Sequence, residues 1–123
     1  MNLHYEKTPQ DFPGQSACVL ITATNAEGVV VGSVIVKLPQ RSSVAEFAYL
    51  FVRREVRRHG IGRELLKQAE ITACFAHKVA ISCEVHPSNF EALQFYGALG
   101  FQAAFTFQGG EILMSKPLGG GAA

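Results

Sequence analysis

A short basic stretch with two glycines, Arg57-Arg58-His59-Gly60-Ile61-Gly62, constrains this sequence more than any other feature. It lies between an apolar run, residues 47–52, and an amphipathic run that begins at Ile61. This order predicts a strand, a turn and the N-terminus of a helix. The first N–H groups of a helix have no partner within it, and the helix dipole places about half a positive charge there. Four arginines surround the turn: Arg53, Arg54, Arg57 and Arg58. The stretch therefore predicts a phosphate-binding site.

Length and composition indicate one globular domain. The chain has 123 residues, of which 48% are hydrophobic and 17% charged, so we expect a single domain over residues 1–118. The glycine-rich tail, residues 119–123, is expected to be disordered and without chemistry. The net charge of +1 argues against a nucleic-acid or membrane surface, because such surfaces need a basic excess over a whole face.

The cysteines and the N-terminus predict a cytoplasmic protein. Cys18, Cys74 and Cys83 are far apart and odd in number, which favours free thiols in a reducing compartment. Residues 1–7 lack the apolar core of a signal peptide, and no apolar run approaches the ~20 residues of a membrane span. The histidines have no metal-ligand spacing with one another or with a cysteine, so we expect no metal site.

The first half of the chain predicts three strands. Residues 1–15 have no clean period and are interpreted as an irregular lead-in. Residues 17–24 and 29–38 predict a hairpin, and Gly32 within the second strand indicates a bulge or a close approach by another group. Residues 44–52 are almost wholly apolar apart from one glutamate and predict a strand at the centre of the sheet.

The second half predicts two helices and three strands. A helix over about residues 60–76 and a strand over 79–85 form, with the preceding strand, a unit typical of parallel neighbours. Ser88 and Glu91 fit a capping box, with Ser88 as the cap of a helix that ends at Gly100. Residues 101–107 and 111–116 predict a second hairpin.

Four segments together resemble the GNAT-type N-acetyltransferases. Arg57-x-x-Gly60-x-Gly62 resembles the acyl-CoA-binding motif of that family, and residues 46–52 resemble its fourth strand. The block Asn89-x-x-Ala92-x-x-x-Tyr96-x-x-Leu99-Gly100-Phe101 resembles its second CoA-contacting motif, and residues 112–118 resemble its last strand. The resemblance covers about residues 17–118, with the motifs in the family's order.

The resemblance implies an α/β (α+β) fold. Its sheet is mixed and mostly antiparallel, with a central parallel pair of strands and flanking helices. Only about 16 residues precede the first clear strand, so we expect a version that lacks most of the N-terminal strand and helices of the family. Those helices help to wall the acceptor site, and a homodimer could complete it.

The implied function is transfer of an acetyl group from acetyl-CoA directly to a primary amine of a small molecule or peptide. No nucleic acid, membrane or metal takes part. The residues expected to contact CoA are Leu50, Phe51, Val52, Arg57, Arg58, His59, Gly60, Ile61, Gly62, Arg63, Asn89, Ala92 and Tyr96. A main-chain N–H near Val52 is expected to stabilise the oxyanion. The alternative function is a non-catalytic CoA-binding or interaction module, which the short N-terminus favours. An RNA-binding protein is disfavoured by the near-neutral charge.

Glu46 is the candidate base, since burial in an apolar strand would raise its pKa, and the alternative is an edge charge. His86 is the alternative base, or a residue that caps the turn. Tyr96 resembles the general acid of the family, which would protonate the leaving thiolate, and is otherwise a core aromatic.

Two further residues have competing interpretations. Asn89 resembles the residue that binds the pantetheine arm, and otherwise caps a helix. Cys83 is interpreted as a small buried core residue rather than as an acylated nucleophile, because its strand is apolar.

Overall fold

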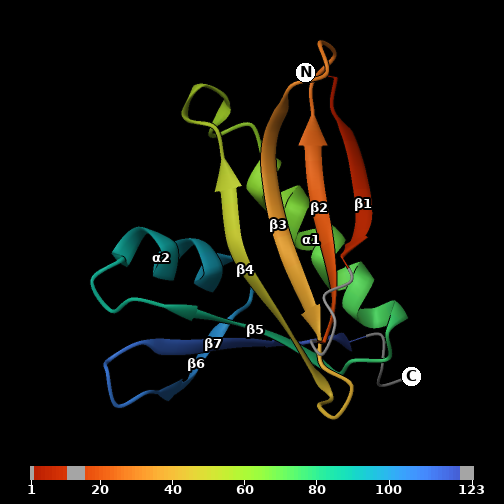
Figure 1. The fold of residues 1–123 in the computed structure, drawn as a ribbon. Coiled ribbons are helices and arrows are strands. Elements are labelled where there is room, and N and C mark those ends of the chain that lie inside the picture. Colours follow the sequence, from red (N-terminus) through yellow and green to blue (C-terminus); the bar gives the residue numbers. More distant parts are fainter. Residues whose placement is uncertain (1, 11–15, 120–123) are drawn as a thin grey trace.

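The structure, a computed structural model, describes residues 2–10 and 16–119, and its seven strands form one sheet (Figure 1). The order across the sheet is β1-β2-β3-β4-β5-β7-β6, with β4 at the centre and β4–β5 as the parallel pair. The strands are β1 (His4–Gln10), β2 (Ala17–Thr24), β3 (Val30–Leu38), β4 (Val44–Val52), β5 (Ala80–Val85), β6 (Gln102–Thr106) and β7 (Ile112–Pro117). The helices are the short 3-10 turn η1 (Arg54–Val56), α1 (Ile61–Phe75) and α2 (Phe90–Ala98). The expected mixed, mostly antiparallel sheet is confirmed. The tail that was expected to be disordered lies, from residue 120 on, outside the described residues.

The N-terminal segment corrects one prediction. Residues 4–10 are not an irregular lead-in but the edge strand β1, which pairs antiparallel with β2 from His4↔Thr24 to Gln10↔Cys18. The strand was missed because its side chains are mostly polar and exposed, as on an edge strand that contains Glu6, Lys7 and Pro9. A strand therefore precedes β2, and six residues, 11–16, connect the two strands.

Gly32 in β3 lies where the backbone of β4 and the side chains of α1 come closest. A Cβ atom at this position would lie 3.0 Å from the carbonyl oxygen of Phe51 and 3.1 Å from side-chain carbons of Ile61 and Leu65. The close approach predicted from the sequence is confirmed, and the absence of a side chain is what allows α1 to pack on the sheet here.

Substitution of Gly32 by Ala should destabilise the fold by about 1–3 kcal/mol, because neither the backbone of β4 nor the buried helix can move freely. Gly97→Ala is the matched control: a Cβ there meets nothing within 4 Å, and in helix α2 it should stabilise by up to about 1 kcal/mol. Urea-induced unfolding measures both variants. Equal stabilities would show that the packing at Gly32 is not tight.

Strand β4 has a bulge in its second half, which the sequence did not reveal. Its register with β3 runs from Lys37↔Glu46 to Ile35↔Ala48 and resumes at Ser33↔Phe51, so β4 has one extra residue between these pairs. Tyr49 lies there with φ at 56°, in the left-handed region that few side chains adopt. The bulge frees main-chain groups of β4 from the ladder with β3.

Strands β4 and β5 separate soon after they meet. They pair at three positions only, 44–46 of β4 with 80–82 of β5, and Figure 1 shows the two strands diverging beyond that point. The edge of β4 that faces β5 is therefore without a strand partner from residue 47 on. The candidate site lies where these two strands separate.

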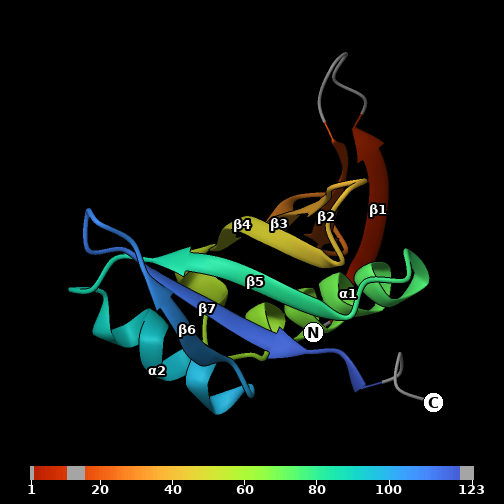
Figure 2. The same cartoon turned by 90° about the horizontal axis from the view of Figure 1, so that it is seen from below.

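Both helices lie on the same face of the sheet, as Figure 2 shows. Gly62 in the first turn of α1 is close enough to Phe95 of α2 that a Cβ would lie 3.3 Å from that ring. The core lies between these helices and the sheet and includes Ile21, Val34, Val36, Phe47, Ile61, Leu65, Leu66, Ile81, Phe101 and Met114. In the described part of the chain, no helix covers the opposite face, and no helix is long and apolar enough to cross a membrane.

The cap of α2 corrects a second prediction. Asn89, not Ser88, is the N-cap, and its Oδ1 accepts a hydrogen bond of 3.1 Å from the N–H of Ala92. The Ser88 hydroxyl lies instead 2.7 Å from Nδ1 of His86. At the other end, Gly100 has φ at 97°, as predicted for a left-handed cap.

Asn89→Ala should cost about 1 kcal/mol of stability through the lost cap, whereas Ser88→Ala should cost no more than a few tenths. Hydrogen exchange of the amides in the first turn of α2 measures this directly. Greater exchange in Ser88→Ala than in Asn89→Ala would contradict the cap assignment.

Candidate functional site

The turn before α1 is built to present N–H groups. Arg58 and Gly60 both have positive φ, at 69° and 78°, and Gly60 caps the helix without any side-chain hydrogen bond. The first N–H that bonds back into the helix is that of Glu64, to the Gly60 carbonyl at 3.0 Å. The N–H groups of residues 61–63 therefore remain open at the positive end of the helix dipole, which is a favourable site for a phosphate group.

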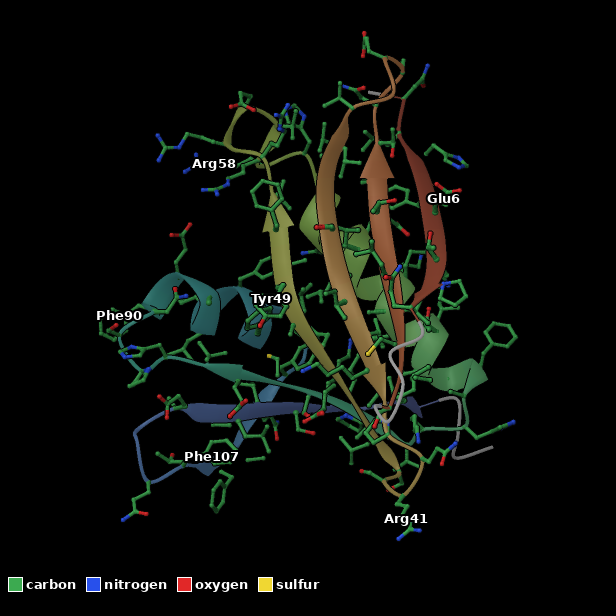
Figure 3. The ribbon with its side chains drawn as sticks, in the orientation of Figure 1. Glu6, Arg41, Tyr49, Arg58, Phe90 and Phe107 are labelled. Atoms are coloured by element: carbon green, nitrogen blue, oxygen red, sulfur yellow. The ribbon has the colours of Figure 1, made fainter. Side chains whose placement is uncertain are left out.

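The basic side chains of this turn are exposed. Figure 3 shows Arg58 on the outer side of the turn, away from β3. Arg57 is also exposed, but its Nε donates a 3.0 Å hydrogen bond to the carbonyl of Val52, which ties the turn to the end of β4. His59 and Arg63 are exposed as well, whereas the Ile61 side chain is buried, so Ile61 can contribute only its main chain to a ligand.

The predicted residues of β4 lie at the bulge and on the open edge of the strand. Leu50 and Val52 are half-buried and pack against the core, and Phe51 is exposed. The bulge is at Tyr49 and Leu50, two to three residues before the position near Val52 where the oxyanion donor was expected. A linear ligand could pair with this unpartnered edge between the basic turn and the bulge.

Tyr96 on α2 packs against Phe47 of β4, with ring centroids 5.5 Å apart. Phe95 and Phe101 flank it. Among the described residues its hydroxyl has no hydrogen-bond partner within the protein. Burial raises the pKa of Tyr96 to about 12, with a smaller contribution from Cys83. The phenol is therefore protonated at neutral pH and is free to donate to a ligand.

Cys83 of β5 is buried next to this phenol, and burial raises the pKa of its thiol to about 12. A thiol with so high a pKa is almost entirely protonated at neutral pH and is a poor nucleophile. This agrees with a core role and disfavours an acylated cysteine.

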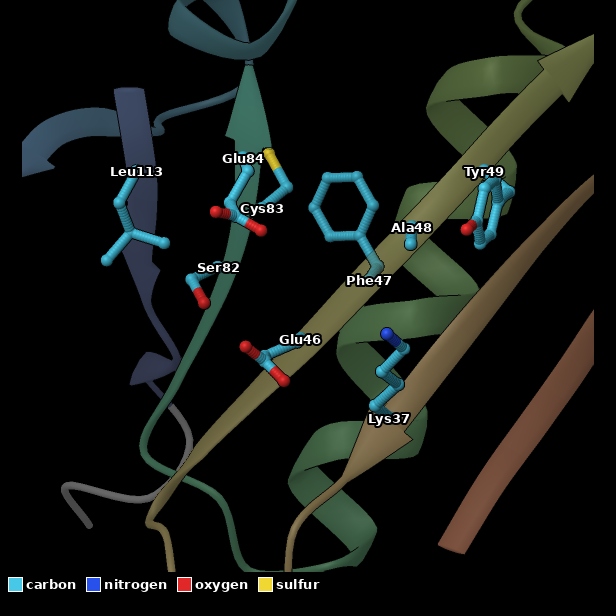
Figure 4. Close-up of a pocket in the computed structure, with 9 residues that line it drawn as sticks. All are labelled: Lys37, Glu46, Phe47, Ala48, Tyr49, Ser82, Cys83, Glu84 and Leu113. Carbon is cyan, nitrogen blue, oxygen red and sulfur yellow. The ribbon is translucent and has the colours of Figure 1, made fainter. Parts of the chain in front are cut away.

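A groove of about 330 Å³ opens where β4 and β5 separate (Figure 4). Phe47, which packs against Tyr96, lines it together with Ala48, Tyr49, Ser82, Cys83, Leu113 and three charged residues, Lys37, Glu46 and Glu84. Phe47 therefore contacts both the groove and the ring of Tyr96. Ser82 is 4% exposed, and its hydroxyl donates to the carbonyl of Ala45 at 3.4 Å.

Glu46 does line the groove, but the expectation that it is buried is wrong, because the residue is exposed. The position alternates with Ala45 and Phe47, which point into the core, so Glu46 faces the uncovered side of the sheet. Burial therefore cannot be what prepares this carboxylate for catalysis.

Sequence reasoning missed Glu84 and Lys37. Glu84 lies on β5 two residues after Ser82, the partner of Glu46, and so faces the same side. Lys37 of β3 lies directly opposite Glu46 of β4 in the register of the sheet. Alternation along each strand could have placed all three on one face, but only the strand order brings them to one groove.

His86 is exposed and is less suited to act as a base than expected. Its Nδ1 accepts a 3.1 Å hydrogen bond from the N–H of Ser88, so the neutral ring carries its proton on Nε2. The Ser88 hydroxyl lies against the same Nδ1. The only lone pair that could take a proton is therefore already engaged in the turn.

The two predicted residues of α2 lie together. Asn89 uses its side-chain oxygen for the helix cap, which leaves the amide NH₂ free to donate to a ligand, so the cap and the binding role are compatible. Ala92 is half-buried on the same first turn. Among the described residues, no three His, Cys, Asp or Glu side chains are placed to hold a metal ion.

Comparisons with known proteins agree with this fold. The model of the acetyltransferase (GNAT) family matches residues 3–101, and no curated protein matches the sequence. An IAA acetyltransferase from Bacillus cereus is 18% identical with a TM-score of 0.77, over 95% of this chain and 100% of that one. A PaiA N-acetyltransferase from Thermoplasma acidophilum, in complex with coenzyme A, is 24% identical with a TM-score of 0.72, over 81% and 60%.

A third solved structure, the ribosomal-protein-S18-alanine N-acetyltransferase from Escherichia coli, is 22% identical with a TM-score of 0.69, over 82% of this chain and 69% of that one. At these identities the structural likeness establishes the fold alone. The family match covers most of the chain, including the basic turn, the bulged strand and the helix of Tyr96. On this evidence the chain belongs to the GNAT family of acetyltransferases.

Proposed function

We propose that this protein is an acetyl-CoA-dependent N-acetyltransferase that transfers the acetyl group directly to a primary amine of a small molecule. One observation carries the proposal. The separation of β4 and β5 leaves an open strand edge with a helix N-terminus of free N–H groups at one end and, at the other, a phenol near a groove lined by carboxylates. A pantetheine thioester has the matching order of groups, from pyrophosphate to acyl carbon.

The donor would bind along this edge. The pyrophosphate would accept hydrogen bonds from the N–H groups of residues 61–63, with Arg58 adding charge-assisted contacts. The pantetheine arm would pair with the main chain of residues 50–52 and with the Asn89 amide. A main-chain N–H freed by the bulge would stabilise the oxyanion that forms on the thioester carbonyl.

The chemistry needs a proton taken from the amine and a proton given to the leaving thiolate. Glu46 would accept the first, and the neutral amine would then attack the thioester carbon. The second proton on that nitrogen would pass to solvent as the tetrahedral intermediate collapses to the amide. As the C–S bond breaks, the Tyr96 hydroxyl would donate its proton to sulfur and be reprotonated from solvent. Because burial raises the pKa of Tyr96 to about 12, the phenol holds its proton at neutral pH until the thiolate forms.

Binding of CoA tests the donor site. At about 100 times its Kd, CoA should raise the free energy of unfolding by about 2.7 kcal/mol. Arg58→Glu should weaken binding roughly 10- to 100-fold, by loss of a charge-assisted contact and by repulsion. Arg41→Glu is the matched control, because Arg41 is exposed at the opposite end of the sheet (Figure 3). Thermal unfolding with and without CoA gives the readout.

Thiol release from acetyl-CoA, followed over a panel of amines, tests the reaction itself. We expect release that depends on both an amine and Tyr96. No stabilisation by CoA would contradict the donor site and the enzyme together. Stabilisation by CoA without thiol release for any amine would instead support a non-catalytic CoA-binding module.

A further inference from the structure

The groove between β4 and β5 has charges of both signs on one face of the sheet. Two carboxylates, Glu46 and Glu84, come from β4 and β5, and one ammonium, Lys37, comes from β3. In the register of the sheet, Glu46 lies opposite Lys37 of β3 on one side and opposite Ser82 of β5 on the other, so these side chains share a face. Figure 4 shows Glu84 on the β5 side of the groove, Glu46 near its middle and Lys37 beyond it toward β3.

The three charged groups of the groove do not form ion pairs with one another. In the part of the chain that the structure describes, the ion pair within 4.0 Å joins Lys116 to Glu70, and none joins Lys37 to Glu46 or Glu84. All three groove residues are exposed, so each can meet a ligand from solvent. The groove therefore offers one cationic and two anionic contacts to whatever enters it.

The size of the groove limits what can enter. At about 330 Å³ it lies at the lower end of the range for small-molecule sites, roughly 300–1,000 Å³. Phe47, Ala48 and Leu113 add apolar surface, and Tyr49, Ser82 and Cys83 complete the lining. A small molecule with separate positive and negative groups on a short carbon frame fits this lining.

Three classes of amine differ in how they match these charges. A polyamine would place one of its cationic groups near Lys37, where like charges repel. A peptide N-terminus has one positive charge, but it carries an amide at the position where a carboxylate would be needed to bind Lys37. A free amino acid carries an ammonium and a carboxylate on one carbon, and both signs are matched.

Resting on the proposed acetyltransferase function, we infer that the acceptor is a free amino acid, or a close zwitterionic analogue, whose carboxylate binds Lys37 and whose amine lies between Glu46 and Glu84. In this pose the amine is next to Phe47, which lines the groove and packs against Tyr96. Lys37 is then a specificity-determining residue, and it takes no part in proton transfer.

The test compares matched acceptors. Each common amino acid is assayed with acetyl-CoA beside its carboxamide and its decarboxylated amine, with spermidine as a cationic acceptor. The best amino acid should exceed its two counterparts by roughly 10- to 100-fold in kcat/KM, the effect of one hydrogen bond to a charged group, and mainly through KM. Lys37→Glu should reverse this order, favouring the amines and spermidine over the amino acid.

Lys67→Glu is the control, because Lys67 is exposed on α1, across the sheet from the groove, and undergoes the same change of charge. It should leave the order of acceptors unchanged. Amines or carboxamides that are acetylated as well as amino acids, or a Lys37→Glu variant that lowers all acceptors equally, would overturn this inference and leave the acetyltransferase function standing. Absence of thiol release with every acceptor would overturn both.

Discussion

Replacing Tyr96 by Phe should lower kcat for acetyl transfer by roughly 10²- to 10⁴-fold and leave the affinity for CoA nearly unchanged. The substitution removes only the hydroxyl, and among the described residues that hydroxyl has no partner in the protein. The packing of the ring on Phe47, Phe95 and Phe101 is preserved, so the fold should keep its stability. Steady-state kinetics together with CoA-dependent thermal unfolding separate the two effects.

Tyr5→Phe is the matched control for this experiment. Tyr5 is a half-buried phenol on β1, packed on the same core but distant from the groove, and its pKa is also raised by burial and, to a smaller extent, by Glu64. Its loss should leave kcat unaltered. Because the pKa of Tyr96 is about 12, its ionisation should cause no fall in kcat below about pH 10 in the unsubstituted protein. Normal turnover in Tyr96→Phe would remove the phenol as the acid.

Replacing Glu46 by Gln should lower kcat by roughly 10²- to 10⁴-fold near neutral pH, because the amide cannot take a proton from the acceptor. Raising the pH should recover part of the loss, since more of the amine is then already deprotonated. Glu46 is exposed, so the substitution should change stability by no more than about 0.5 kcal/mol. The pH dependence of kcat in both proteins is the measurement.

Glu84→Gln is the companion to that variant. Glu84 lines the same groove from β5, and we expect its loss to raise KM for the acceptor about tenfold while kcat falls much less. The opposite result, a large fall in kcat for Glu84→Gln and only a change in KM for Glu46→Gln, would exchange the two roles. His86→Gln should have little effect on the pH profile, because Nδ1 of His86 is already bonded to the Ser88 N–H.

The sequence was most informative where backbone conformation depends on a single residue type. Gly60 adopts a positive φ at the start of α1, and Gly32 leaves room for β4 and α1. Such positions have a local signature, because few residues other than glycine fit them. The central strand and the helix after it were predictable for a similar reason. An almost wholly apolar run is compatible with few structures other than a buried strand, and apolar residues at helical spacing with few other than an amphipathic helix.

The predictions from sequence that the structure corrected also have physical causes. Strand β1 has little hydrophobic pattern because it is an edge strand, and its conformation comes from hydrogen bonds to β2. The choice between Ser88 and Asn89 as a cap depends on where the turn after β5 ends, and the contact between Ser88 and His86 settles it. The exposure of Glu46 follows from the absence of any helix over that face in the described part of the chain.

By itself, the sequence determined the basic glycine turn and the order of the elements around it, because a strand, a turn and a helix are local structures. Only the tertiary structure decided which side chains share the groove. Glu46, Glu84 and Lys37 lie on three different strands, and they meet because β4 stands between β3 and β5 and parts from β5 after three pairs. The strand order and the point of separation are set by packing between distant segments, which no local pattern records.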